Sequence, residues 1–317
     1  MNIVLLEPLA VKNYIIEGLA KKAVDMGHTF KAYDNVTKDV EELKRRSREA
    51  DILIIANNPL PGEVIRAAER LKYIAVAFTG VDHVDKAACM EKGIKVSNAA
   101  GYSTDSVAEL AVALIIDALR NVIPCDERVR RGGTKEGLVG TQLKGKTVGI
   151  VGTGAIGLRV GELLRPFKCK LLGYSRSERM EGKNLGIEYV SLEELLKSSD
   201  IVTLHVPLNE DTKKLINEER LKLMKPSSVL VNLARGPVVD SNALADALNQ
   251  GKIAKACIDV FETEPPIEEN HPLLKAKNTL VTPHIAFATE ESMIIRAELT
   301  FDNLYSYLEG SIKNQVI

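Results

Sequence analysis

The sequence predicts an α/β protein with two parallel-sheet domains, Rossmann-like or flavodoxin-like, and a cleft between them. Short apolar runs rich in β-branched residues alternate with helical patterns along most of the chain. This alternation is typical of parallel sheets with helices on both faces. One strand-to-helix junction also carries a glycine fingerprint, and the 317 residues are enough for about two domains.

Composition argues against several classes of partner. The chain has 42 Lys and Arg against 43 Asp and Glu residues, so we expect neither a nucleic-acid nor a membrane partner. Aromatic residues make up 4% and Trp is absent, which leaves no stacking platform for bases. The four cysteines stand far apart without a CxxC pair. This spacing argues against a disulfide framework or a metal site and favours a reducing, cytoplasmic setting.

The first hundred residues predict one parallel sheet. A helix should cover 12–26, because Gly27 is a usual C-terminal stop. No glycine fingerprint follows the first strand, so we expect this unit to carry the substrate. The predicted strands are 2–6, 29–33, 52–56, 73–77 and 95–97.

Residues 103–120 predict the clearest helix outside the fingerprint, because apolar residues recur there at spacings of three and four. Ser103 or Thr104 can cap its start. It should connect the two sheet units. The next stretch, 121–146, is polar, contains glycine and is weakly patterned. We expect it to be irregular and to serve a purpose such as partner contact.

The glycine fingerprint lies between an apolar strand at 148–151 and a helix that ends near Pro166. Its first glycine allows a tight turn, its second lets backbone approach a pyrophosphate, and its third lets helix and strand pack closely. Unpaired N–H groups at the helix start would bind the phosphates. A further strand at 170–174 favours a dinucleotide site over an ordinary turn. The residues expected at the phosphates are Gly152, Gly154, Ala155, Ile156 and Gly157.

The rest of the second half repeats the alternation. Ser191 begins a capping-box pattern that opens a short helix. Further strands are expected at 200–205, 228–232, 255–260 and 280–282, with helices at 217–224, 241–250 and 289–310.

Arg235, Glu264 and His284 follow successive predicted strands. Ligands of open parallel sheets bind beyond the carboxyl ends of the strands, so these side chains should meet the nicotinamide end of a cofactor. The guanidinium fork suits the carboxylate of a 2-oxo acid. A carboxylate-backed imidazolium can protonate the carbonyl oxygen as hydride arrives at carbon. Taken singly, each residue is more often structural, but their joint placement after a nucleotide fingerprint favours catalysis.

A series of motifs in order resembles the D-isomer-specific 2-hydroxyacid dehydrogenases, the family of glycerate, phosphoglycerate and hydroxypyruvate enzymes. The resemblance covers essentially the whole chain and implies the catalytic roles of Arg235, Glu264 and His284 given above. The motifs are FTGVDHVD (78–85), STDSVAEL (103–110), the fingerprint, HVPL (205–208), LVNLARG (230–236), DVFETEP (259–265) and TPHIA (282–286).

The resemblance also implies binding residues. Asp259 would hold the nicotinamide amide, and Thr104 and Ala234 would lie near the cofactor. The adenosine side would be bordered by His205, Val206 and Pro207. Backbone N–H groups for the substrate carboxylate would come from Phe78, Thr79 and Gly80.

The domain plan follows from the same resemblance, since the family fold returns its last helix to the first domain. It implies a discontinuous substrate domain, 1–100 plus 290–317, and a dinucleotide domain, 101–289. Family members are typically homodimers joined through the arm that corresponds to 121–146. Relatives often have a Trp near 131–138, and this chain has none.

The choice of cofactor depends on the end of the second strand of the dinucleotide unit. NAD-dependent relatives have an Asp there that binds the ribose hydroxyls, and this chain has Ser175 followed by Arg176. Loss of the carboxylate removes repulsion toward a 2′-phosphate, which Arg176 could pair with. The sequence therefore favours NADP(H). The alternative is that Arg176 lies along the adenine and NAD(H) binds.

The substrate loop at 55–60 has no basic residue where phosphoglycerate enzymes tend to place arginine. Asn57 and Asn58 suit neutral polar groups, so we expect a small unphosphorylated 2-oxo or 2-hydroxy acid such as glyoxylate or hydroxypyruvate. One alternative is a short D-3-phosphoglycerate dehydrogenase. Another, of a different class, is a non-catalytic nucleotide-sensing protein similar to the corepressors of this family.

Overall fold

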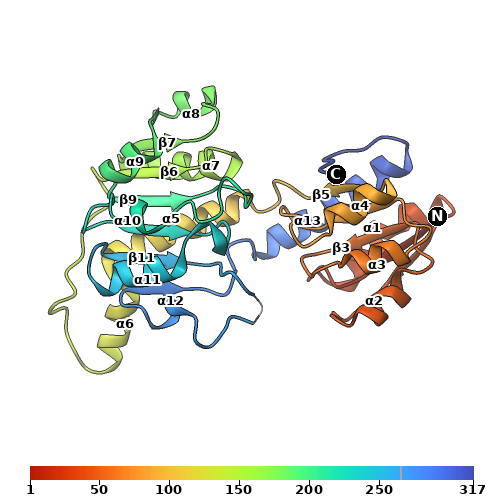
Figure 1. Cartoon of the computed structure of the whole chain (residues 1–317), viewed down its shortest axis with the longest axis horizontal. Helices are drawn as coiled ribbons and strands as arrows, with labels where there is room; N and C mark the ends of the chain where they lie inside the picture. Colours follow the sequence, from red (N-terminus) through yellow and green to blue (C-terminus); the bar gives the residue numbers. More distant parts are fainter. Residues whose placement is uncertain (265) are drawn as a thin grey trace. The chain divides into compact units, whose positions relative to one another are not determined.

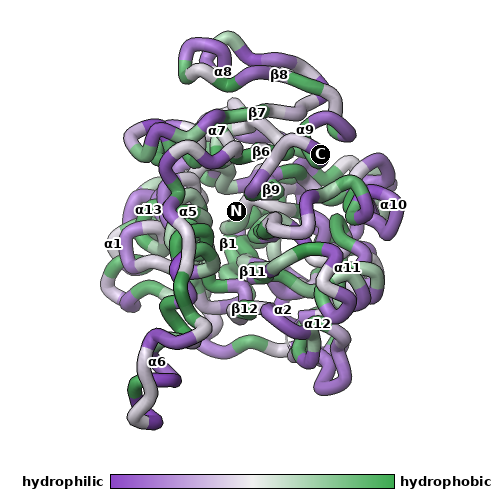
Figure 2. Tube along the Cα trace, turned by 90° about the vertical axis from the view of Figure 1, so that its left-hand side faces the viewer, coloured by the Kyte–Doolittle hydropathy of each residue, from purple (hydrophilic) through white to green (hydrophobic). Residues whose placement is uncertain are grey.

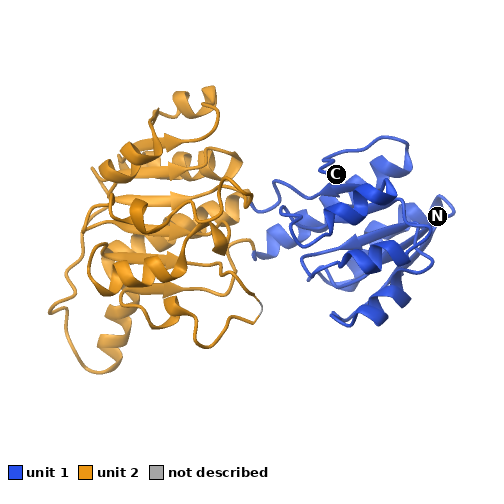
Figure 3. Ribbon diagram, in the orientation of Figure 1, with its two compact units in different colours: residues 1–103, 288–317 blue, residues 104–287 orange. Residues whose placement is uncertain are grey.

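Two parallel sheets organise the chain. A computed structural model describes residues 1–264 and 266–317, in two units. Unit 1 contains Met1–Ser103 and Ala288–Ile317, and unit 2 contains Thr104–Phe287 (Figure 3). All strand pairs within the two sheets are parallel, which confirms the predicted fold class.

Unit 1 has a five-stranded sheet in the order β2-β1-β3-β4-β5 (Figure 1). Its central strands are buried along their whole length, which explains their continuous apolar runs. The strands are β1 (Asn2–Leu5), β2 (Thr29–Ala32), β3 (Ile52–Ile55), β4 (Tyr73–Val76) and β5 (Lys95–Asn98). The helices are α1 (Asn13–Asp25), α2 (Val40–Ser47), α3 (Gly62–Ala67), α4 (Lys86–Lys92) and α13 (Glu290–Leu308).

The last helix, α13, belongs to unit 1 although unit 2 separates it from β5 in sequence. Thr289 caps its start in a capping box with Ser292. Phe301 of α13 is fully buried among residues of β1, β3 and β4, in the same cluster as Ile16 of α1. The helix is therefore part of the core of unit 1.

Unit 2 has a seven-stranded sheet in the order β12-β11-β10-β9-β6-β7-β8. The order reverses between β6 and β9, the place where such sheets bind nucleotides. The strands are β6 (Thr147–Val151), β7 (Lys170–Tyr174), β8 (Ile187–Tyr189), β9 (Ile201–Leu204), β10 (Val229–Asn232), β11 (Lys255–Ile258) and β12 (Thr279–Val281). The α-helices are α5 (Thr104–Arg120), α6 (Val122–Arg130), α7 (Ala155–Leu164), α8 (Met180–Asn184), α9 (Leu192–Ser198), α10 (Glu218–Leu221), α11 (Ser241–Asn249) and α12 (Pro272–Lys275).

Helices cover both faces of this sheet. One core cluster joins α5 and α7 to strand residues such as Ile150 and Val231, and another joins α9, α11 and α12 to Val202 and Leu230. In Figure 2 the hydrophobic colour gathers on the strands and inner helices, whereas α8 and α10 are mainly hydrophilic. No helix in the described part of the chain combines the length and apolarity needed to cross a bilayer.

The expected strands and helices are present, with ends that mostly differ by one or two residues. One expectation is wrong: the stretch 121–146 is not wholly irregular, because Val122–Arg130 forms α6. This helix has no buried residue and so has no apolar stripe to reveal it. The helix expected at 217–224 is shorter, Glu218–Leu221. The sequence analysis also missed β8, α8 and α12, which have three to five residues each.

Candidate active site

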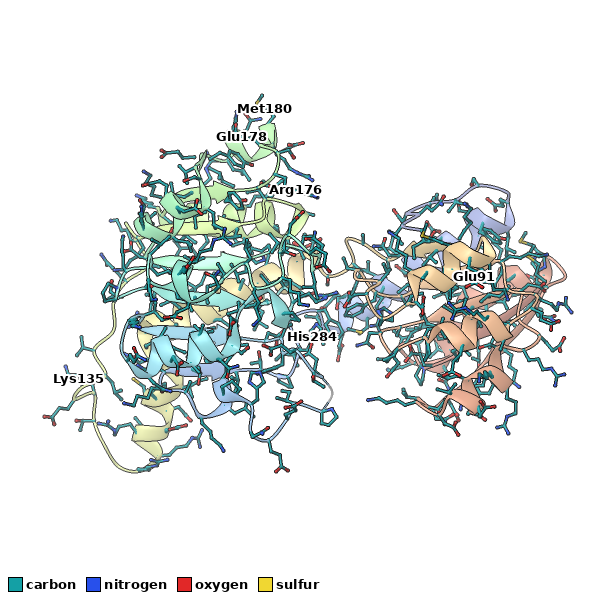
Figure 4. The ribbon with its side chains drawn as sticks, in the orientation of Figure 1. Glu91, Lys135, Arg176, Glu178, Met180 and His284 are labelled. Carbon is teal, nitrogen blue, oxygen red and sulfur yellow. The ribbon has the colours of Figure 1, made fainter. Side chains whose placement is uncertain are left out.

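Three neighbouring strands of unit 2 bring the predicted catalytic residues to one edge of the sheet. Arg235 follows β10, Glu264 follows β11 and His284 follows β12, and these strands are adjacent. Because the strands are parallel, their carboxyl ends share this edge. His284 is marked there in Figure 4.

His284 and Glu264 contact each other at this edge. His284 Nδ1 lies 2.6 Å from Glu264 Oε1, and their side chains are 22% and 18% exposed. The other oxygen of Glu264 accepts a hydrogen bond of 3.1 Å from the Phe261 N–H. The Phe287 ring stands perpendicular to the imidazole, with centroids 5.2 Å apart. The imidazole is thus oriented by a carboxylate and an aromatic ring while part of it stays accessible.

A buried carboxylate fixes the loop that carries His284. Asp259 is 0% exposed, and its Oδ1 accepts from the Thr282 hydroxyl at 2.6 Å and from Ile285 N at 2.9 Å. Its Oδ2 accepts from Ala286 N at 2.9 Å. The pKa of Asp259 is raised above its usual value, because the effect of burial exceeds the opposite effect of these hydrogen bonds. The role that the sequence analysis expected for Asp259, holding the nicotinamide amide, stays a prediction.

His284 itself has a strained backbone, with φ of 53°. Its N–H donates to the Asp259 carbonyl at 2.8 Å and to the Thr282 carbonyl at 3.1 Å. Asp259 therefore holds the left-handed residue through its backbone and the flanking residues through its side chain.

The loop of Arg235 is fixed by Asn232, the last residue of β10. Asn232 is 1% exposed; its Nδ2 donates to the Arg235 carbonyl at 2.9 Å and its Oδ1 accepts from Ala234 N at 3.1 Å. Next in the chain is Gly236, where a Cβ would overlap the backbone of Phe261. Glycine at this position lets the Arg235 loop approach the loop of Glu264.

The glycine fingerprint has the geometry its sequence predicts. Gly152 has φ of 97°, and a Cβ there would overlap the carbonyl of His205. A Cβ at Gly157 would overlap the Gly152 carbonyl, so helix α7 and the turn pack closely. A Cβ at Gly154 would meet no protein atom within 4 Å. Glycine at 154 thus leaves open space at the start of α7, which fits a bound phosphate.

The other expected cofactor residues lie at the same edge of the sheet. Ala155 and Ile156 are the first residues of α7, exposed and half-buried respectively, and Thr104 is the half-buried first residue of α5. Ala234 is half-buried in the Arg235 loop. Ser175 and Arg176 follow β7, and the Arg176 side chain is exposed (Figure 4).

His205, Val206 and Pro207 follow β9, next to the fingerprint. Both His205 and Val206 are half-buried, and Pro207 is exposed. The His205 ring lies with Nε2 2.9 Å from the hydroxyl of Thr203, which is fully buried. Burial lowers the pKa of His205 to about 4. The imidazole beside the fingerprint is therefore neutral at pH 7.

The expected substrate residues of unit 1 follow β3 and β4. Asn57 and Thr79 are exposed, Gly80 is half-buried and Phe78 is 5% exposed. The turn of Phe78 to Gly80 is held by Asn98, whose Nδ2 donates to the Thr79 carbonyl at 2.7 Å.

A buried glutamate holds the other substrate loop. Glu7 is 4% exposed and accepts from Ala56 N at 2.7 Å and from the side chain of Asn58. This contact fixes the half-buried Asn58, whereas its neighbour Asn57 is exposed.

The family model for the D-isomer specific 2-hydroxyacid dehydrogenase NAD-binding domain matches residues 112–286. This range contains the fingerprint and the three residues at the edges of β10, β11 and β12. The chain belongs to this family. The expected resemblance is thereby confirmed, and the dehydrogenase has the nucleotide-binding unit that the fingerprint predicted.

Relatives of known sequence and structure resemble this dehydrogenase over most of its length. A glyoxylate reductase from Thermofilum pendens is 42% identical over 280 residues, covering 86% of this chain and 82% of the relative. A hydroxypyruvate reductase from Blautia hydrogenotrophica is 36% identical over 294 residues, covering 90% of each. The structure of an acyclic imino acid reductase (Bsp5) in complex with NADPH and D-Arg is 29% identical, with a TM-score of 0.89 over 100% of both chains.

Three supporting residues of the dehydrogenase were not predicted: Asn232, Glu7 and Tyr189. Asn at the end of a strand before Leu-Ala-Arg is a turn signal that could have suggested Asn232. Neither Glu7 nor Tyr189 had a comparable signal. Glu7 accepts from Ala56 N, 49 residues away, and the Tyr189 hydroxyl donates to Thr153 Oγ1, 36 residues away. Pro265, the last residue of the DVFETEP motif, lies outside the described residues.

The depressed pKa of His205 predicts acid sensitivity of unit 2. An unfolded histidine has a pKa of about 6.5, and the folded value is about 4. Between these values the unfolded chain binds a proton that the folded chain does not, so stability falls as pH drops through this window. His205→Gln should flatten that part of the curve of unfolding free energy against pH, measured by urea unfolding of the protein without cofactor. Equal slopes for both proteins would contradict this assignment.

Proposed function

We propose that the chain is an NADPH-dependent reductase of small unphosphorylated 2-oxo acids, similar to glyoxylate and hydroxypyruvate reductases. The observation that carries the proposal is the 2.6 Å pair of His284 and Glu264. These residues follow β12 and β11, the two strands that come next in the sheet after β10, which ends before Arg235. Relatives named glyoxylate reductase and hydroxypyruvate reductase support this substrate class.

His284 is the proposed general acid and Glu264 its orienting partner. A carboxylate on Nδ1 fixes the orientation of the ring, which leaves Nε2 to donate to the oxygen of the substrate carbonyl. When bound, the nicotinamide supplies hydride to the carbonyl carbon. The proton lost by Nε2 completes the hydroxyl group of the product, and in the reverse direction the imidazole accepts it.

Arg235 is the proposed carboxylate-binding residue. A guanidinium can form two parallel hydrogen bonds with a carboxylate, which fixes both the position and the plane of the substrate. The Asn232 contacts hold the loop at the Arg235 carbonyl and at the Ala234 N–H. In unit 1 we assign Asn57, Phe78, Thr79 and Gly80 to substrate binding.

The cofactor residues fit a dinucleotide. The phosphates would bind at Gly152 to Gly157, where the open position of Gly154 leaves room for them. On the nicotinamide side we assign Thr104 and Ala234, and on the adenosine side His205, Val206 and Pro207. We assign Asp259 to positioning the His284 loop, because its carboxylate is buried and hydrogen-bonded there.

NADPH is favoured over NADH on charge. Ser175 and Arg176 place no carboxylate and one exposed guanidinium after β7, which suits a 2′-phosphate. The NADPH in the structure of the imino acid reductase supports this choice.

A homodimer formed through 121–146 is also part of the proposal. Val122, Val129 and Val139 in this arm are 52%, 68% and 82% exposed. Beside the arm is a hollow of about 560 Å³, lined by residues of α5, α6 and β12. Exposed apolar side chains next to a hollow of this size are typical of an interaction surface.

His284→Ala should lower kcat for reduction of glyoxylate or hydroxypyruvate by about 10²–10⁴-fold, because no group remains to protonate the carbonyl. The affinity for NADPH, measured by fluorescence titration, should stay within about twofold. Tyr14→Phe, in an exposed position of unit 1, serves as the control.

Two outcomes would overturn the enzyme assignment. One is a wild-type protein that binds NADPH but reduces none of a dozen 2-oxo acids, as a nucleotide-sensing protein would. The other is a His284→Ala variant that reduces them at the wild-type rate. Phosphohydroxypyruvate outperforming the unphosphorylated acids would reject the substrate class only.

Arg176→Ala should lower the ratio of kcat/KM for NADPH to that for NADH by about tenfold or more, since a charge-assisted contact to phosphate contributes about 1.5–3 kcal/mol. Arg165→Ala, at the other end of α7, is the matched control because it removes the same charge from the same unit. A ratio unchanged by Arg176→Ala, or a wild-type preference for NADH, would refute the NADPH assignment.

A further inference from the structure

Tyr189 connects two loops that both belong to the proposed cofactor site. It is the last residue of β8 and pairs with Gly173 of β7. Its hydroxyl donates to Thr153 Oγ1 at 3.0 Å and accepts from Arg179 N at 3.2 Å. One hydroxyl therefore bridges the glycine fingerprint and the loop that follows β7.

The two partners of this hydroxyl lie in the two segments proposed to bind the cofactor. Thr153 lies between the first two glycines of the fingerprint and is 0% exposed. Arg179 is the N-cap residue of α8 and comes three residues after Arg176. Figure 4 shows Arg176, Glu178 and Met180 along this loop and the start of α8.

The local sequence leaves space for the bridge. A Cβ at Gly182 of α8 would overlap the Tyr189 hydroxyl. A Cβ at Gly173 would overlap Ile187 Cγ2 and lie 3.2 Å from Thr153 Cγ2. Neither glycine has positive φ, so the need for glycine at these positions is one of space. The backbone of α8 thus closes directly on the hydroxyl group.

We propose that Tyr189 is a specificity-determining positioning residue: its hydroxyl fixes the Ser175–Arg179 loop relative to the glycine fingerprint and so sets the preference for NADPH. This inference rests on the proposed cofactor site. A dinucleotide binds to the fingerprint through its pyrophosphate. The covalent structure of NADPH sets the distance from this pyrophosphate to the 2′-phosphate. Arg176 can meet the 2′-phosphate only if its loop keeps a fixed distance from the fingerprint.

Binding of NADH depends less on the position of this loop than binding of NADPH does. A ribose hydroxyl carries no charge for Arg176 to bind, so loss of the loop position costs NADH less than NADPH. The bridge should therefore affect the ratio of the two cofactors, whereas a purely structural contact would affect both equally.

The test is a double-mutant cycle of Tyr189→Phe and Thr153→Val. Each single variant removes one end of the 3.0 Å hydrogen bond and changes little volume. Steady-state kcat/KM and the dissociation constants by titration are measured for NADPH and NADH, with Tyr14→Phe as the control. Thermal midpoints report any general loss of stability.

Tyr189→Phe should lower the NADPH-to-NADH ratio about threefold to tenfold or more, because the hydrogen bonds of its hydroxyl to Thr153 and from Arg179 are both lost. The change should appear in KM and Kd for NADPH with kcat nearly unchanged. The double variant should be no worse than Tyr189→Phe alone, because that variant already removes the contact with Thr153.

The role of Tyr189 would be overturned if Tyr189→Phe lowered kcat/KM equally for NADPH and NADH, which leaves their ratio unchanged. It would also be overturned if the effects of the two substitutions on that ratio were additive in the double variant. If Tyr189→Phe does not fold, the effect of Thr153→Val on the NADPH-to-NADH ratio of kcat/KM tests the proposal on its own. A wild-type preference for NADH would instead refute the cofactor proposal, and it is read from the wild-type protein before any variant is compared.

Discussion

The structure of the candidate active site depends on the buried carboxylate of Asp259. It accepts hydrogen bonds from Thr282, Ile285 and Ala286, which lie on both sides of His284. The positive φ of His284 costs free energy, and these hydrogen bonds hold the loop in that conformation. A carboxylate with no exposure is unfavourable unless it is hydrogen-bonded. The loop and the carboxylate thus stabilise each other.

At the same edge of the unit 2 sheet, polar side chains at strand ends hold the other functional loops. Asn232 fixes the Arg235 loop, and Tyr189 connects the fingerprint to the loop of Arg176. The side chains of Arg235 and His284, proposed to touch the substrate, are partly exposed, whereas Asn232 and Thr153 are nearly or fully buried. The sheet therefore positions the loops, and the loops carry the residues proposed to bind and act on the substrate.

The sequence predicted the parts of the fold that depend on local pattern. Buried parallel strands such as Ile52–Ile55 appear as continuous apolar runs, and the three glycines of the fingerprint mark a turn whose sterics the structure bears out. Helix α6 escaped prediction because none of its residues is buried. The register of β8 on β7 places the Tyr189 hydroxyl next to its partners. This register cannot be read from a single sequence. The buried state of Asp259 was equally unpredictable, since its partners lie 23 to 27 residues further along the chain.

The most direct measurement of the central claim is the kinetics of Asp259→Asn together with its affinity for NADPH. The variant keeps the size of the side chain but presents an amide NH₂ to donors that need an acceptor. If Asp259 positions the His284 loop, kcat for 2-oxo acid reduction should fall about 100-fold or more while the Kd for NADPH stays within about threefold. An unchanged kcat, or a loss confined to cofactor affinity, would contradict the account.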